Sequence, residues 1–173
     1  NTTASSNVGI GTGALFTNTT GASNIAIGVQ SLNANTTASN NTAIGHQSLL
    51  SNTTGTENVA VGSEALDANT TGAESVAVGY GALSNATTGS YNTALGKSAL
   101  GSNTTASNNT AVGKSALAST TTGTRNTSVG AASLDANTTA NDNTAIGYNS
   151  LSANTIGTCL LYTSDAADEG LGV

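Results

Sequence analysis

Large aliphatic residues recur along this chain with a fixed spacing of 17 residues, without an insertion or deletion. A leucine follows this period at Leu15, Leu32, Leu49, Leu66, Leu83, Leu100, Leu117, Leu134 and Leu151. Five residues before each leucine stands Ile, Val or Leu, and a glycine follows that residue, from Gly11 to Gly147. A strict period of this length is the signature of a repeat architecture, and nine repeats fill positions 7 to 159.

The repeats share the pattern N-[TVI]-A-[IVL]-G-x-x-[AS]-L-x-x-N-T-T-[GA]-x-x, whose positions we number 1 to 17 from Asn7. Positions 2 and 4 are mostly β-branched and flank a small residue, which predicts a short strand with aliphatic side chains on one side and Ala on the other. The glycine at position 5 and the N-T-T-G stretch predict turns. We therefore expect an all-β fold: a parallel β-solenoid, or β-roll, of nine 17-residue coils with two short strands per coil.

Such a coil buries little apolar surface. Three sizeable apolar side chains per coil contribute roughly 5–8 kcal/mol, less than the cost of ordering the coil, so neighbouring coils and neighbouring chains must add to it. The small side chains at position 3 form a strip suited to packing between chains, and we expect a homotrimer on this account. The strip consists of Ala26, Ala43, Ala60, Ala77, Ala94 and Ala111.

Composition narrows the function further. Charged residues make up 7% of the chain and the net charge is −6, which excludes the basic surface that nucleic acid requires. No apolar run is long enough to cross a bilayer, so we expect no membrane insertion within this sequence. The single cysteine, Cys159, excludes an internal disulfide framework. The chain begins at Asn1 with the repeat already running, and we interpret it as a fragment.

The repeat ends at Cys159, where the sequence changes to C-L-L-Y-T-S-D-A-A-D-E. This stretch resembles one reading frame of an adapter used in short-read sequencing libraries, which would make the chain a metagenomic fragment with a non-native tail. The alternative is a genuine acidic capping segment. We divide the chain into residues 1–6, the end of a preceding repeat, residues 7–158, the solenoid array, and residues 159–173, a tail expected to be disordered.

No residue is predicted to be catalytic, cofactor-binding or metal-ligating, so we expect a non-catalytic protein without a cofactor. His46 is the only histidine, at a position that accepts many residue types, and no second His or Cys could complete a metal site with it. No Ser-His-Asp set or close carboxylate pair is indicated. The Gly-rich segment Asn7–Gly13 is the repeat itself, and the regular Asp positions of calcium-binding repeats are absent.

The N-T-T motif allows two interpretations, glycosylation or an Asn ladder inside the turns; we favour the ladder because the motif recurs at one place in the coil. N-x-[ST] sequences begin at Asn1, Asn18, Asn35, Asn40, Asn52, Asn69, Asn85, Asn103, Asn108, Asn126 and Asn137. The Thr pairs also suggest an ice-binding surface as a further alternative. Adjacent residues of a strand point to opposite sides, however, so this is a distant alternative.

The repeated N-x-A-[IV]-G motif, with Ser75-Val76-Ala77-Val78-Gly79 as its nearest match, resembles the head repeats of trimeric autotransporter adhesins over residues 7 to 158. The longer 17-residue form resembles repeat arrays of bacterial and phage tail-fibre-like proteins. The resemblance implies a homotrimeric extracellular fibre, left-handed in the adhesin heads, on a bacterial cell surface or a virion.

Two functions follow from this resemblance. One is an adhesin-like segment that mediates surface attachment through a host-surface, matrix or glycan ligand. The alternative is a purely structural shaft of a tail fibre. Any ligand specificity must lie at the variable positions 6, 7, 10, 11, 16 and 17, because the other positions are committed to structure.

Overall fold

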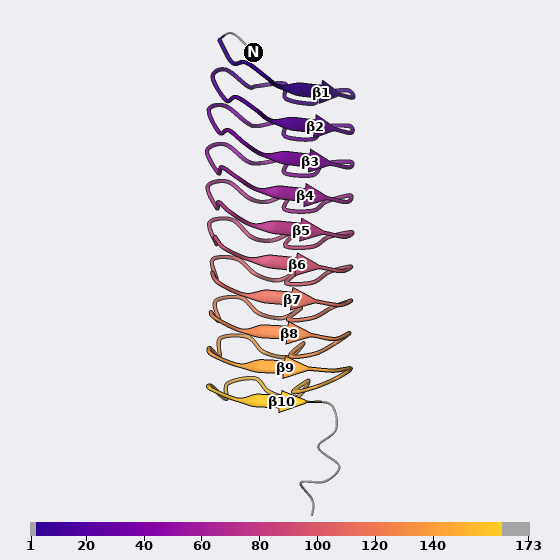
Figure 1. Ribbon diagram of the computed structural model, residues 1–173, viewed down its shortest axis with the longest axis vertical. Helices are drawn as coiled ribbons and strands as arrows, with labels where there is room; N and C mark the ends of the chain where they lie inside the picture. The colour runs from indigo at the N-terminus through magenta and orange to yellow at the C-terminus, as the bar shows by residue number, and fades with distance from the viewer. Residues whose placement is uncertain (1–2, 164–173) are drawn as a thin grey trace, which may run out of the picture.

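The computed structural model describes residues 3–163, which form one rod of stacked coils (Figure 1). Ten strands make a single parallel sheet in chain order, each paired in register with the strand one coil away. They are β1 (Val8–Ile10), β2 (Ile25–Ile27), β3 (Thr42–Ile44), β4 (Val59–Val61), β5 (Val76–Val78), β6 (Thr93–Leu95), β7 (Thr110–Val112), β8 (Thr127–Val129), β9 (Thr144–Ile146) and β10 (Leu161–Thr163). The predicted all-β parallel solenoid of 17-residue coils is confirmed.

Each described coil carries one three-residue strand and not the two that the sequence led us to expect. After the strand, the backbone at positions 7 and 9 adopts left-handed values, as at Gln30 (φ 58°) and Leu32 (φ 48°). An extended strand cannot contain such residues, so this part of the coil is a run of turns. Its amides still bond to the adjacent coils, as Leu32 N–H does to the Ser48 carbonyl at 3.0 Å.

The core is thin and lies along the axis of the rod. The leucines at position 9 are fully buried from Leu32 to Leu134, and the alanines at position 3, such as Ala43 and Ala60, are 0% exposed. The prediction that this Ala strip packs between chains is therefore wrong. Position 3 points into the coil, where Leu and two Asn side chains leave room for a methyl group, and the branched side chains at positions 2 and 4 point outward.

Two buried Asn ladders run beside the leucines. At position 1, Asn24 Nδ2 donates to the Ala38 carbonyl at 2.9 Å, while Asn24 Oδ1 accepts from the Asn41 amide at 2.9 Å. At position 12, Asn35 Nδ2 donates to Asn18 Oδ1 at 2.8 Å and to the same Ala38 carbonyl at 3.0 Å. The Asn ladder predicted from the N-T-T motif is confirmed.

This arrangement separates the N-x-[ST] sequences into two groups. The position-12 asparagines from Asn18 to Asn137, and also Asn126, are at most 1% exposed, which closes them to glycosylation in the folded chain. The exposed members of the set are Asn40, Asn85 and Asn108. Asn1 lies outside the described residues.

Both ladders are interrupted in one coil, where Ser75 occupies position 1 and Ala86 occupies position 12. As a result, the buried Asn69 Oδ1 has no hydrogen-bond partner. We expect Ala86→Asn to stabilise the protein by about 1 kcal/mol, because the new amide would donate to Asn69 Oδ1 and to the Gly89 carbonyl. The urea midpoint of unfolding measures this gain. Ala82→Asn, buried in the same coil but outside both ladders, is the control and should destabilise. A lower midpoint for Ala86→Asn would contradict the prediction.

The last strand belongs to the predicted tail. Leu161–Thr163 form β10, in which Tyr162 pairs with Ala145 at position 3 and is 40% exposed. Residues 164–173 of that tail, like residues 1–2, lie outside the described part of the chain.

Candidate functional site

The outward side chains of strands β1–β9, at positions 2 and 4, form what we call the aliphatic face. Position 4 is Ile, Val or Leu in every coil, and position 2 is Val, Ile or Thr. Because the strands pair in register, these side chains lie in two continuous rows along the whole rod. More than a third of each of the following side chains is exposed: Val8, Ile10, Ile25, Ile44, Val78, Leu95, Val129 and Ile146.

The aliphatic face contains no charged residue. Single exposed apolar side chains are normal on a protein surface, but a continuous apolar strip of this length is unusual for a monomer and is typical of an interaction surface. The strands are parallel and identical in length, so position 4 presents an aliphatic side chain at every coil, beside Val, Ile or Thr at position 2. Sequence analysis found these residues but placed them in the core, because period-two alternation does not say which side faces inward.

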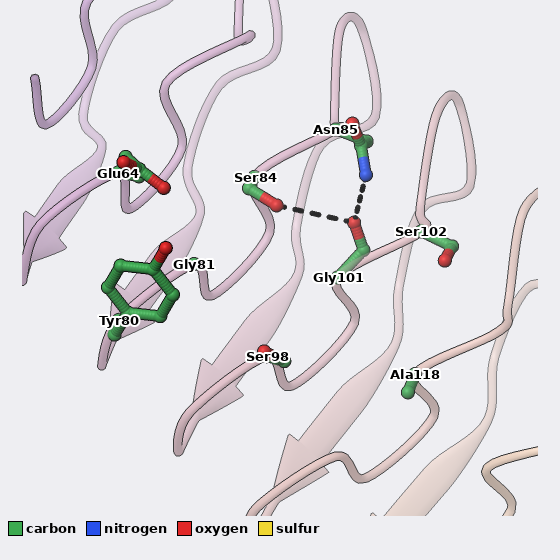
Figure 2. A pocket seen from close by; sticks show the side chains of 9 residues that line it. All are labelled: Glu64, Tyr80, Gly81, Ser84, Asn85, Ser98, Gly101, Ser102 and Ala118. Atoms are coloured by element: carbon green, nitrogen blue, oxygen red, sulfur yellow. Dashed lines mark hydrogen bonds between the residues drawn. The ribbon is translucent and has the colours of Figure 1, made fainter.

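A second feature is a shallow hollow of about 350 Å³ on the turn segment that follows the strands (Figure 2). It spans four coils, and no lining residue belongs to a strand. Glu64, Tyr80 and Asn85 stand at its rim, whereas Gly81 is buried in its floor. The lining is completed by Ser84, Ser98, Gly101, Ser102 and Ala118.

Tyr80 lies near two charged side chains, those of Glu64 and Lys97. Hydrogen bonding to the Glu64 carboxylate, together with its negative charge, raises the pKa of the Tyr80 phenol above its usual value. The Lys97 amino group lies over the ring, 5.7 Å from its centre, in a cation–π contact. Since the three residues come from three successive coils, the stacking of the solenoid alone brings them together.

A half-buried carboxylate, that of Asp67, lies one coil before Ser84 at position 10. Its Oδ1 has no hydrogen-bond partner, and burial raises the pKa of this carboxyl above the usual Asp value. Asp67 does not line the hollow but adds negative charge beside it, next to Glu64. The surroundings of Tyr80 are thus more acidic than basic.

Elsewhere the variable positions show solvated surface. Arg125 forms a two-pronged pair with Asp142 one coil away, Nε–Oδ1 2.6 Å and Nη2–Oδ2 2.9 Å. These hydrogen bonds hold the pKa of Asp142 below its usual value. Both side chains are largely exposed, so the pair contributes little to stability. His46 is exposed at position 6, as the sequence suggested.

The two threonines of each N-T-T motif lie in different environments. At position 13 the hydroxyl donates to the carbonyl of the next coil, as from Thr53 to Thr70 at 3.0 Å and from Thr70 to Thr87 at 3.0 Å. At position 14 the residues from Thr20 to Thr139 are exposed. The adjacent pair therefore supplies one free row of threonines and not two.

Within residues 3–163, no three His, Cys, Asp or Glu side chains gather closely enough to hold a metal ion. The same residues contain no helix of the length and apolarity that a membrane span needs. A second hollow, of about 400 Å³, lies at the last coils against Leu160 and Tyr162, where the stack of coils ends.

Comparison of the chain with protein-family models, with curated proteins and with solved structures gives no match.

Proposed function

We propose that this chain is a non-catalytic segment of an extracellular fibre that assembles as a homotrimer along its aliphatic faces and mediates attachment to a surface. The observation that carries the proposal is the uncharged, exposed row of Val, Ile and Leu that extends over β1–β9. Covering it with the same face of other copies would remove apolar surface from water at about 25 cal/mol per Å². This contribution offsets the small core of each coil.

The geometry of the rod supports lateral assembly of identical chains. The strands repeat in register at every coil and each carries an aliphatic side chain at position 4, so a second copy aligned along the same axis finds an aliphatic row at every level. Closed symmetric assembly then covers all the faces and leaves none exposed. The number three comes from the resemblance of the N-x-A-[IV]-G motif to trimeric adhesin heads, and the location on a bacterial surface or virion comes from the same source.

A purely structural shaft is the second candidate. It is favoured by the unbroken register of the nine strand pairs, which makes a straight spacer of uniform thickness. The two candidates share the aliphatic face and differ in whether any part of the remaining surface binds a ligand.

Sedimentation of the full chain at micromolar concentration tests the assembly. We expect a mass three times the 16.6 kDa of one chain. The double variant Val78→Asp with Leu95→Asp places two charges on the aliphatic face and should shift the mass to that of a monomer, because a buried unpaired carboxylate is costly. The far-ultraviolet spectrum shows whether this variant keeps its strands.

The matched control is Thr88→Asp with Thr105→Asp, which adds the same two charges to the same two coils at exposed positions off the face. It should keep the trimer mass. A folded wild-type chain that sediments as a monomer would contradict the proposal. So would equal masses for the face variant and the control.

A further inference from the structure

The hollow beside Tyr80 exists because small residues coincide at positions 7 and 10 in three successive coils. Position 7 holds Gln30, Gln47 and Glu64 in the three preceding coils but Gly81, Ser98 and Ser115 in these three. Position 10 likewise changes from Asn33, Leu50 and Asp67 to Ser84, Gly101 and Ala118. Removing the large side chains from both positions in neighbouring coils leaves a depression in an otherwise filled turn surface.

The hollow presents polar groups that the protein does not use. Asn85 Nδ2 donates to the Gly101 carbonyl at 2.6 Å, which fixes the amide and turns its Oδ1 toward solvent as a free acceptor (Figure 2). Among the described residues, the hydroxyls of Ser98 and Ser102 make no hydrogen bond. Each hydroxyl can both donate and accept.

Tyr80 adds an apolar surface beside these groups. Its side chain is 52% exposed and stands at the rim, with the hydroxyl directed toward Glu64 (Figure 2). An exposed aromatic ring next to hydroxyl and amide groups offers a ligand an apolar contact surface and several hydrogen-bonding groups close together.

We infer that this hollow is a binding subsite for one neutral sugar ring of a glycan. A pyranose has an apolar face of C–H groups that packs on an aromatic ring, and a rim of hydroxyls that pair with Asn85 Oδ1, Ser98 and Ser102. The volume of about 350 Å³ suits a single ring and is near the lower end for ligand pockets. The carboxylates of Glu64 and Asp67 disfavour a phosphate or another anion at this place.

One shallow subsite gives weak binding, in the millimolar range, because few groups are desolvated. In the proposed trimer three such hollows would engage one surface together and raise the avidity without any new contact. Only this gain in avidity depends on the proposed function. The subsite itself is formed within one chain, so its binding is measured whatever the mass of the assembly.

Saturation-transfer NMR on the full chain tests the subsite with three probes: methyl α-mannoside, methyl β-galactoside and methyl N-acetyl-β-glucosaminide. Before the measurement, the intact mass confirms that Asn85 is unmodified. We expect transfer to the ring protons of at least one sugar, and a roughly tenfold weaker affinity for it in Tyr80→Ala.

A second variant fills the hollow without disturbing the backbone. Ser98 (φ 56°) shares position 7 with Gln47 (φ 56°), so Ser98→Gln places a side chain that this position already accepts. It should abolish the transfer and leave the unfolding midpoint unchanged. Tyr148→Ala is the control, since Tyr148 is an exposed tyrosine at the same coil position outside the hollow, and it should bind as wild type does. No transfer to any of the three sugars would overturn the inference, as would equal binding by wild type and Tyr80→Ala.

Discussion

Gly96→Ala is expected to destabilise the protein by about 3–5 kcal/mol, although it adds one methyl group. Gly96 has φ +136°, in a region that residues with a side chain hardly occupy. A Cβ at this position would lie 2.5 Å from the Gly113 carbonyl oxygen and 2.6 Å from its carbon. These are backbone atoms of the next coil, so the clash cannot be relieved by a side-chain rotation.

The strain would spread along the rod, because Gly113 occupies the same place relative to Gly130 and is itself locked by a bond from its amide to the Leu95 carbonyl at 2.8 Å. Moving one coil away from the methyl group would lengthen the backbone hydrogen bonds that join it to the coils on both sides. Urea unfolding followed by circular dichroism measures the loss. In a repeat protein a broken neighbour contact can also split the transition into two, since coils are held only by the coils next to them.

Gly81→Ala provides the matched comparison. Gly81 also has a positive φ, +62°, but a Cβ there meets nothing closer than 3.9 Å, and residues with side chains adopt this conformation at position 7 in other coils. Its cost should be about 1 kcal/mol or less. If the two alanine variants unfold at the same urea concentration, close packing of the position-5 glycines does not govern the coil spacing.

Most of the fold follows from the sequence, because a perfect 17-residue period fixes the coil length and the register together. The leucines, the glycines at position 5 and the asparagines of the N-T-T motif all occupy the structural places that their columns indicated. The period alone could not predict which side chains fill the interior of the coil. Whether Ala43 or Ile44 faces inward depends on the space left by Leu49 and the Asn ladders, a volume that appears only when the coil is closed.

The second strand was predicted wrongly for a local reason: leucine at φ +50° is unfavourable in isolation, and no sequence rule assigns this turn conformation to nine leucines. The hollow was missed because it belongs to no single repeat. It requires small residues at positions 7 and 10 in consecutive coils, with Tyr80 and Glu64 beside them. Aligning the repeats and marking runs of small residues at variable positions would have found Gly81, Ser98 and Gly101.

Asn58→Ala is expected to cost about 2–4 kcal/mol, because it leaves the buried Ser75 amide without a partner and removes one of the two donors to the Gly72 carbonyl, the other being Asn69 Nδ2. Asn58 Nδ2 donates to the Gly72 carbonyl at 2.8 Å, and Asn58 Oδ1 accepts from the Ser75 amide at 3.0 Å. The side chain is 0% exposed, so water does not replace it at either group without opening the coil.

Asn58→Ser should cost less than the alanine variant, and the chain itself shows why. Ser75 occupies the same position one coil later, where its hydroxyl accepts from the Asn92 amide at 3.2 Å. A serine at position 58 would therefore keep the acceptor for the Ser75 amide and lose only the donor to Gly72. Thr54→Ala, which removes an exposed hydroxyl without a hydrogen bond in the described chain, should change stability by about 0.5 kcal/mol or less.

Native-state hydrogen exchange distinguishes this account from a general loss of packing. If Asn58 Oδ1 is the acceptor that protects the Ser75 amide, hydrogen exchange of that amide should accelerate in Asn58→Ala and remain slow in Asn58→Ser. Loss of packing volume alone would affect both variants alike, since Ser and Ala are nearly the same size. Equal exchange of the Ser75 amide in the two variants would show that the leucines and the strand ladder, and not the Asn ladder, hold successive coils in register at this point.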